Sequence, residues 1–246
     1  LNLVTKEKKL GIKLIRNKKR NILLSIIYRI QKLLPLNNER KFKLFLNLEW
    51  IFDRLSHEMS IKNYEASQHP GRLLSKKTIL SNIKETSIVL DLGCNSGDIS
   101  SFIAEIAKEV VGIDYNKKAI EAAKQKYKKD NLFFYHGEAL EYLNNNEKKF
   151  DILILSHILE HLDNPEDFLK KFKDHFREIY IEVPDFDRYY LNLYRQEKGL
   201  ELIYSDEDHV SEFDRDELKL LLDACGITIN KAEYRYGMQK LWCSTK

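Results

Sequence analysis

From residue 85 onward, the chain alternates between short apolar runs and segments with helical spacing. Five β-branched or apolar runs predict strands, at residues 87–92, 110–114, 132–135, 150–156 and 178–183. The segments between them predict helices, at residues 99–108, 117–128, 139–143 and 165–176. Strands that alternate with helices are most simply built into a parallel sheet with helices on both faces. The nearly continuous apolar run at 150–156 is typical of a strand covered on both sides.

The C-terminal part predicts one more helix and a closing hairpin. Asp214 and Glu217 have the spacing of a capping box at the start of a helix over 217–224, and Gly226 would end it. Two further strands, at about 228–236 and 240–244, flank Gly237. The predicted fold class is therefore α/β: a doubly wound, mostly parallel sheet of seven strands with an N-terminal helical extension.

The first part of the chain differs in charge from the rest. Residues 1–43 carry 13 Lys and Arg against 2 Asp and Glu, a net +11, so the remainder carries −8 of the total +3. Within residues 10–34, Leu and Ile recur at helical spacing between basic residues, which predicts one or two amphipathic helices that end at Pro35. Such a segment can pack on the main domain, on a partner chain or second copy, or on a membrane surface.

These patterns divide the chain into three expected parts. Residues 1–45 form the basic extension, residues 46–84 a helical cap, and residues 85–246 the main domain with an insertion at about 184–213. The apolar runs are shorter than the roughly 20 residues that cross a bilayer, and the three cysteines fit no C-x-x-C pattern. We expect a soluble, cytoplasmic protein with reduced thiols.

The loop after the first strand, V-L-D-L-G-C-N-S-G-D at 89–98, is the expected ligand site, because doubly wound sheets bind ligands at the carboxyl ends of their strands. Gly93 and Gly97 permit tight turns, and Asn95 tolerates a positive φ. The carboxylates of Asp91 and Asp98 would repel a phosphate and suit a cationic group, which argues against a nicotinamide dinucleotide.

The end of the second strand adds a ribose contact. Asp114 follows Asp91 by 23 residues and is placed to accept hydrogen bonds from two ribose hydroxyls. The implied ligand has a ribose and an amino group but no phosphate.

Four blocks in this order resemble the class I S-adenosylmethionine-dependent methyltransferases over roughly residues 60–246: V-L-D-L-G-C-N-S-G-D (89–98), V-G-I-D-Y (111–115), H-G-E-A (136–139) and F-D-I-L-I-L-S-H-I-L-E-H-L (150–162). The resemblance implies S-adenosylmethionine as cofactor, S-adenosylhomocysteine as product, and residues 85–246 as the catalytic domain. The departure is Asn95, where the family commonly has glycine.

Carried over to this sequence, the resemblance implies a set of cofactor-binding residues. Asp91, Gly93, Cys94, Asn95 and Gly97 would surround the methionine part of the donor, and Asp114 would hold the ribose. The adenine would meet Tyr115, Glu138 and Ala139, with Ser156 and His157 on the floor of the site. Arg72, in the segment before the sheet, is a candidate to grip the methionine carboxylate.

Transfer to an oxygen also needs a base for the acceptor proton. His157, Glu160 and His161 are spaced i, i+3 and i+4, and would share one face of a helical turn after the fourth strand. His161 is the leading general-base candidate, followed by His209, with His157 in the same cluster. A structural histidine is the competing interpretation for each.

The same cluster raises the question of a metal. It is similar to the S-E-x-L-E-H segment of ubiquinone-biosynthesis O-methyltransferases, in which acids and a histidine bind a divalent metal. His157, Glu160 and His161 are therefore weak metal candidates, and no metal is favoured.

The acceptor is predicted only by class. His209 lies in D-H-V-S-E-F (208–213), which resembles a common element of small-molecule methyltransferases, and Trp50–Met59 resembles enzymes that modify surface polysaccharides. We expect a small polar acceptor, such as a sugar or phosphorylated precursor of surface polysaccharide, methylated on oxygen. A nucleic-acid acceptor is not expected, because the fourth strand lacks the [ND]-P-P-[YFW] tetrapeptide. The alternatives are an rRNA or protein methyltransferase that uses the basic extension and a noncatalytic partner subunit.

Overall fold

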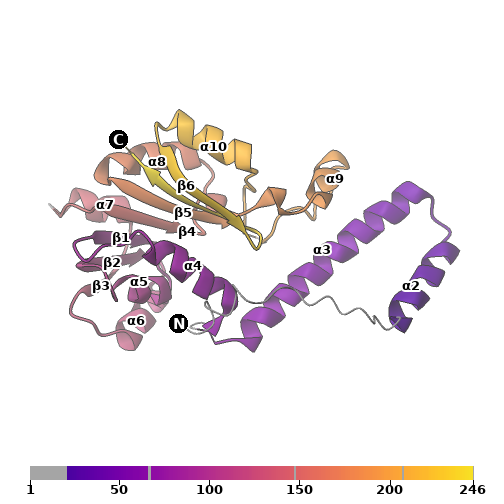
Figure 1. The fold of residues 1–246 in the computed structure, drawn as a ribbon, viewed down its shortest axis with the longest axis horizontal. Coiled ribbons are helices and arrows are strands. Elements are labelled where there is room, and N and C mark those ends of the chain that lie inside the picture. The colour runs from indigo at the N-terminus through magenta and orange to yellow at the C-terminus, as the bar shows by residue number, and fades with distance from the viewer. Residues whose placement is uncertain (1–20, 66–67, 147, 207, 246) are drawn as a thin grey trace. The chain divides into compact units, whose positions relative to one another are not determined.

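The computed structural model describes residues 21–65, 68–146, 148–206 and 208–245 (Figure 1). The chain divides after Leu44 into two compact units. The described part of the first unit contains helix α2 (Ile22–Leu33) and the beginning of α3 (Asn38–Asn63). Helix α3 continues into the second unit, through the boundary expected at residues 45 and 46. Residues 10–20, which belong to the predicted amphipathic stretch, lie outside the described residues.

The second unit contains one sheet of seven strands in the order β3-β2-β1-β4-β5-β7-β6. Strand β7 is antiparallel to both of its neighbours, and the other pairs are parallel. Each strand ends within two residues of its predicted bounds: β1 Ile88–Leu92, β2 Glu109–Asp114, β3 Leu132–His136, β4 Ile152–Ser156, β5 Glu178–Pro184, β6 Thr228–Arg235 and β7 Met238–Ser244. The predicted fold class is confirmed.

Helices cover both faces of this sheet (Figure 1). One face carries α4 (Pro70–Leu80), α5 (Asp98–Ile103) and α6 (Lys117–Lys126), and the other carries α7 (Ala139–Asn144), α8 (Pro165–Phe172) and α10 (Arg215–Ala224). The segment between β5 and β6 also contains α9 (Leu191–Glu197), and short 3₁₀ turns are η2 (Leu159–His161), η3 (Lys173–His175) and η4 (Phe186–Arg188). Helix α5 ends five residues before its predicted end, because the chain turns there to enter β2.

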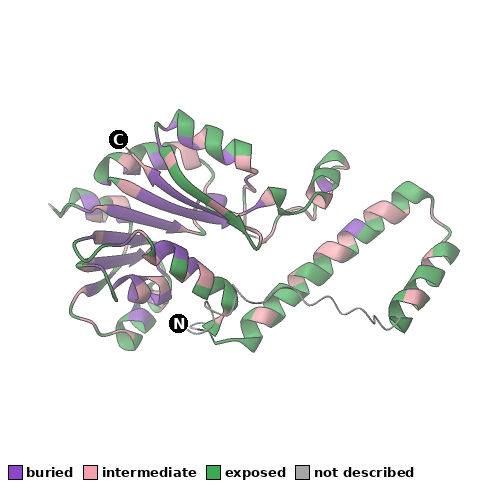
Figure 2. Ribbon diagram, in the orientation of Figure 1, coloured by how far each residue is buried: buried purple, intermediate pink, exposed green. Residues whose placement is uncertain are grey.

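Two apolar cores lie on opposite sides of the sheet because side chains alternate along each strand. Leu90, Leu153 and Leu155 face the core under α7, α8 and α10. Their neighbours Val89, Ile152 and Ile154 face the core under α4 and α5. All six are at most 3% exposed, and the central strands are the most continuously buried part of Figure 2. This burial explains why the central strands read as unbroken apolar runs.

Across the described ranges, no helix is both long enough and apolar enough to cross a membrane.

The start of α10 provides a test of the predicted capping box. Asp214 Oδ1 accepts a hydrogen bond from the amide of Glu217 at 2.7 Å, and Glu217 accepts one from the amide of Asp214 at 3.4 Å. We expect Asp214→Ala to lower the free energy of unfolding by about 1 kcal/mol, since it leaves a helix amide without its partner. Urea titration followed by circular dichroism measures the loss. Asp216→Ala removes a first-turn charge without a capping bond and should cost less; equal costs would contradict the capping role.

Candidate active site

The carboxyl ends of β1, β2 and β4 meet at one edge of the sheet. Strand β1 lies between the other two, so that Asp91 pairs with Gly112 on one side and Ile154 on the other. The loops that follow these three strands are therefore neighbours, as the order of the sequence blocks predicts.

The loop after β1 turns through three residues with left-handed backbone. Gly93, Asn95 and Gly97 have φ values of 71°, 46° and 77°. The amides of Gly93 and Cys94 both donate to the carbonyl of Ile113, at 2.8 and 3.1 Å. A Cβ atom at position 93 would lie 2.3 Å from Cδ1 of Ile158, and a φ of 71° strains other residues, so glycine is strongly favoured there. Asn95 takes the positive φ expected of it.

The carboxylate of Asp114 is held in place by the backbone around it. Its Oδ2 accepts from the amide of Asn95 at 2.8 Å, and its Oδ1 accepts from the amide of Asn116 at 2.7 Å. Each carboxylate oxygen keeps a second lone pair, which can accept a further hydrogen bond. The side chain is oriented before any ligand binds, which fits the predicted contact to two ribose hydroxyls.

Asp91 is a buried acid that forms no ion pair with any of the described residues. Its residue is 2% exposed, and burial raises the pKa of its carboxyl to about 7, against the opposing hydrogen bond from Ser100. The negative charge of Asp114 raises this pKa further. A carboxylate in this position favours a positively charged group beside it.

The other predicted cofactor residues lie along the same edge. Tyr115, directly after Asp114, is 80% exposed, and Glu138 is exposed at the N-cap of α7. Ala139 is buried, and Ser156 ends β4 half-buried. Cys94 is buried within the loop, where desolvation raises the pKa of its thiol above the ordinary value. The contacts of these residues to a cofactor stay a prediction.

Asp98 has a structural role that the sequence did not indicate. Its carboxylate accepts hydrogen bonds from Arg72 at 3.0 Å, Lys126 at 2.8 Å, Ser96 at 2.9 Å and Tyr127. Burial alone would raise the pKa of Asp98, but the hydrogen bonds from Lys126, Tyr127 and Ser96 lower it. The expectation that Asp98 offers its charge to a cationic ligand is therefore wrong, because several protein donors already occupy it. Arg72, half exposed, lies at the loop, and its predicted grip on a carboxylate stays a prediction.

The loop fits an S-adenosylmethionine-type ligand on its own features. A close-packed glycine turn, a preoriented carboxylate at Asp114 and an uncompensated buried acid at Asp91 provide a backbone cradle, a ribose contact and an attraction for an ammonium group. When bound, such a cofactor supplies a methyl group already activated on a sulfonium.

His157 follows β4 with an unusual backbone. Its φ is 58°, and its amide donates to the carbonyl of Glu182 at 2.9 Å. Its Nδ1 lies 3.0 Å from Oε1 of Glu160, whose side chain is fully buried, while the imidazole is 48% exposed. Burial alone would lower the pKa of His157, but the hydrogen bond and charge of Glu160 raise it above the ordinary value. The carboxylate thus orients the imidazole and leaves Nε2 directed away from the pair.

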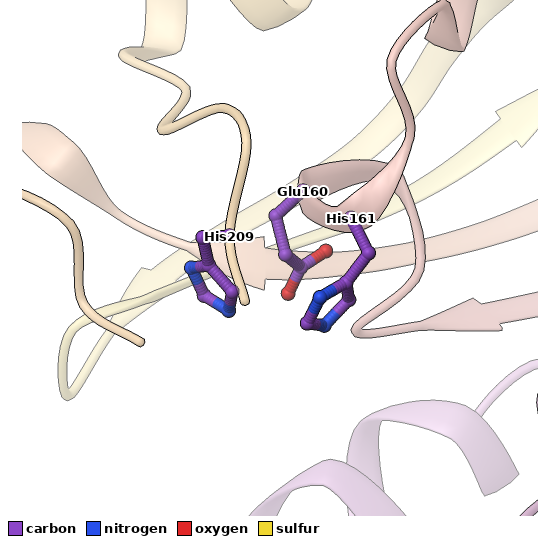
Figure 3. Close-up of side chains that lie close together, drawn as sticks. All are labelled: Glu160, His161 and His209. Atoms are coloured by element: carbon purple, nitrogen blue, oxygen red, sulfur yellow. The ribbon is translucent and has the colours of Figure 1, made fainter. Parts of the chain in front are cut away.

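Glu160, His161 and His209 come together in a second cluster (Figure 3). Glu160 and His161 belong to η2, and His209 comes from the loop before α10. One ligand atom from each lies within 4.8 Å of the others, and the two histidine rings meet edge to face at 4.7 Å. Oε2 of Glu160 is buried without a hydrogen-bond partner in the described chain. Of the predicted metal candidates, His157 lies outside this set, and His209 replaces it.

The two further base candidates have their Nδ1 atoms engaged. Nδ1 of His161 lies 3.1 Å from the carbonyl of Asp208. Nδ1 of His209 lies 2.9 Å from Oε1 of Glu212, and its side chain is only 6% exposed. Burial would lower the pKa of His209, but Glu212 raises it.

A cavity of about 440 Å³ opens beside this edge of the sheet. His157 and His209 line it, and His161 does not. Its other walls come from the middle of α3, from the end of β5 and the segment after it, and from the turn between β6 and β7: Glu49, Trp50, Asp53, Arg54, Ser56, His57, Pro184, Asp185, Phe186, Arg188, Tyr189, Asn192, Arg195, Ile203, Ser205, Asp206, Glu212, Gly237 and Met238. The volume suits a small organic molecule.

The wall formed by α3 was missed by the sequence analysis. Arg54 bonds the carbonyl of Ser205 and reaches Asp206 at 3.0 Å, and Trp50 donates to the carbonyl of Tyr204 at 3.0 Å. These contacts join residues about 150 positions apart. The available signal was the spacing of polar and aromatic side chains at 49, 50, 53, 54 and 57, which share one face of a helix.

Comparison with known proteins gives one family match. The family described as "Methyltransferase domain" matches residues 63–232. The ubiquinone biosynthesis O-methyltransferase of Pelagibacter ubique is 34% identical over 131 residues, which are 53% of this chain and 50% of that protein. The mitochondrial enzyme of the same name from Schizosaccharomyces pombe is 31% identical over 49% of this chain and 43% of its own. The chain thus spans about half the length of these curated relatives.

Solved structures support the fold. Magnesium protoporphyrin IX methyltransferase from Synechocystis, solved with bound S-adenosylhomocysteine, aligns with a TM-score of 0.55 at 18% identity, over 79% of this chain and 94% of its own. A methyltransferase from Archaeoglobus fulgidus aligns with a TM-score of 0.52 at 20% identity, over 70% and 94% of the two chains.

The high pKa of Asp91 predicts that affinity for S-adenosylhomocysteine depends on pH. Only the ionised carboxylate neutralises an ammonium group, so binding releases a proton and strengthens as pH rises. With a pKa of about 7, we expect roughly tenfold tighter binding at about pH 8 than at about pH 6. Calorimetry at both values measures it.

Matched asparagine variants control this test. Asp91→Asn should bind weakly and without the pH dependence, whereas Asp174→Asn, at an exposed position, should behave as the wild type. A wild-type affinity that does not change with pH would contradict the role of Asp91.

Proposed function

Because the chain belongs to the methyltransferase-domain family of class I S-adenosylmethionine-dependent enzymes, we propose that it transfers a methyl group to an oxygen of a small uncharged acceptor. The family match confirms the family predicted from the sequence, and S-adenosylmethionine, the predicted cofactor, is the methyl donor of this family. The single observation that carries the proposal is the His157–Glu160 pair: His157 lines the cavity, and the next residue, Ile158, lies close to Gly93 of the donor loop.

Transfer to oxygen is supported by the names of the curated relatives, which are O-methyltransferases. Those relatives serve ubiquinone biosynthesis, so the surface-polysaccharide acceptor expected from the sequence has no support among them. A ring compound with a free hydroxyl fits the cavity, whose walls include Trp50, Phe186 and Tyr189.

A sugar hydroxyl is the second candidate acceptor. The carboxylates of Asp53 and Asp206 in the cavity wall each accept from one arginine, and a carboxylate has the lone pairs to accept a further hydrogen bond from a hydroxyl. A ring compound of either kind satisfies the geometry.

The charge arrangement argues against a phosphorylated acceptor. Each arginine in the cavity wall is paired with a carboxylate: Arg54 with Asp206 at 3.0 Å, Arg188 with Asp53 at 2.9 Å, and Arg195 with Glu49. Arg195 is 2% exposed, so its charge is committed to the packing of α9 against α3. A phosphate would have to break one of these pairs before it gained a bidentate contact. The proposed acceptor is therefore not a phosphorylated precursor.

His157 is the general base in this scheme and replaces His161. Its imidazole faces the cavity, and Glu160 fixes its tautomer by accepting the Nδ1 proton. Nε2 is then free to take the proton of the acceptor hydroxyl as its oxygen gains the methyl group. His161, outside the cavity wall, packs against His209. The positive charge that forms on His157 is compensated by the buried carboxylate of Glu160.

The first experiment identifies the acceptor. The protein is incubated with methyl-labelled S-adenosylmethionine and extract from its own cells, with half of the extract first treated with phosphatase. We expect label in the small-molecule fraction, equal in both halves. Partition into organic solvent or water then separates a phenolic from a sugar acceptor.

Other outcomes of the same experiment overturn the proposal. Loss of label after phosphatase treatment would indicate a phosphorylated acceptor. Label in RNA or protein would support the alternatives that use the basic extension, and binding of S-adenosylhomocysteine without any transfer would support a noncatalytic partner subunit.

Substitution of the His157–Glu160 pair tests the base. His157→Gln should lower kcat by about 10²- to 10⁴-fold with little change in affinity for S-adenosylhomocysteine. The base acts only when neutral, so kcat should rise with pH to a plateau, with a midpoint above the ordinary histidine value because Glu160 raises the pKa of His157. Glu160→Gln removes that charge and should move the midpoint to lower pH. A large loss of kcat in His161→Gln but not in His157→Gln would restore His161 as the base.

A further inference from the structure

Helix α2 exposes an apolar surface of unusual extent for its length. None of its 12 residues is buried, and Figure 2 shows the helix without a buried position. Its large apolar side chains are 46–83% exposed: Ile22, Leu23, Leu24, Ile26, Ile27, Tyr28, Ile30 and Leu33. Contiguous apolar surface of this kind marks an interaction site.

The helix is amphipathic. At 100° per residue, Leu23, Ile26 and Ile30 lie within a wide apolar arc of the helix, and Arg29 and Lys32 lie with Ser25 in a narrow polar arc. The sequence of α2 contains no acidic residue. The polar face is therefore basic and the apolar face uninterrupted at its centre.

The helix begins and ends at defined signals. The side chain of Asn21 caps its N-terminus by accepting from the amide of Leu24 at 2.9 Å, and Pro35 follows its end. A 12-residue helix with four isoleucines is marginal in water on its own, so its stability depends on burial of the apolar face.

The charge of this part of the chain indicates which kind of surface covers the apolar face of α2. Residues 1–43 carry a net +11, whereas the rest of the chain is acidic. Apolar side chains flanked by Lys and Arg match an anionic lipid surface, because the apolar side chains can enter the acyl boundary while the basic side chains bind the headgroups. At about 1.5 Å per residue, α2 spans roughly 18 Å, which is too short for a bilayer core of about 30 Å. The geometry fits a helix that lies in the interface.

We propose that α2 binds an anionic lipid bilayer as an interfacial helix, with Leu23, Ile26 and Ile30 in the acyl boundary and Arg29 and Lys32 at the headgroups. This goes beyond the proposed methyl transfer and does not depend on it. It identifies a second binding surface on the chain, with a membrane as the partner.

Vesicle flotation with the full chain tests the proposal. The protein should float with vesicles that contain phosphatidylglycerol, should bind pure phosphatidylcholine much more weakly, and should be released from the anionic vesicles by salt. Equal binding to both vesicles, or binding to neither, would overturn the proposal.

Two aspartate variants isolate the apolar face. Ile26→Asp and Ser25→Asp change the net charge equally, but only Ile26 belongs to the apolar arc. We expect Ile26→Asp to weaken partition at least about tenfold more than Ser25→Asp, since it also removes an isoleucine from the acyl boundary. S-adenosylhomocysteine affinity measured in parallel verifies that each variant folds. Equal losses in the two variants would overturn the proposal. It would also be overturned if the chain bound no vesicles and instead formed dimers that Ile26→Asp dissociates.

Discussion

Parallel pairing of β1 with both β2 and β4 is the constraint on which the site depends. Because these strands are buried on both faces, their register is fixed by packing, and a shift of one residue would turn every apolar side chain to the wrong core. That register brings Asp91, Asp114 and the residues after Ser156 to one edge. The chemistry of the site is therefore set by strands that themselves carry mostly apolar residues.

The sequence predicted those elements whose signals are local. Five strands follow from apolar runs, the closing hairpin from the strands that flank Gly237, and the capping box of α10 from the spacing of Asp214 and Glu217. The cavity wall did not follow, because it depends on contacts such as that of Arg195 with Glu49, 146 residues apart. The role of Asp98 was misjudged for the same reason: Arg72, Lys126 and Tyr127, which occupy it, come from before and after the loop.

The choice of base shows how one backbone angle changes a chemical interpretation. Spacing placed His157, Glu160 and His161 on one face of a helical turn. The left-handed φ of His157 keeps it outside η2, so that it turns back to Glu160 while His161 meets His209. Two buried carboxylates have a clear effect in this region. Burial raises the pKa of Asp91, and the buried carboxylate of Glu160 raises the pKa of His157. The electrostatics of the free protein thus favour a positive charge beside Asp91, in the predicted donor site, and on His157, the proposed base.

The contact between Gly93 and Ile158 links the two halves of the site. One belongs to the loop after β1 and the other to the turn that presents His157, and they are so close that a single added carbon at position 93 would overlap Ile158. A side chain at position 93 would strain the backbone, whose φ is 71°, and would also displace the side chain of Ile158, next to the proposed base. A change at position 93 would therefore alter the donor loop and the turn at Ile158 together, and a smaller residue at 158 would relieve only the overlap.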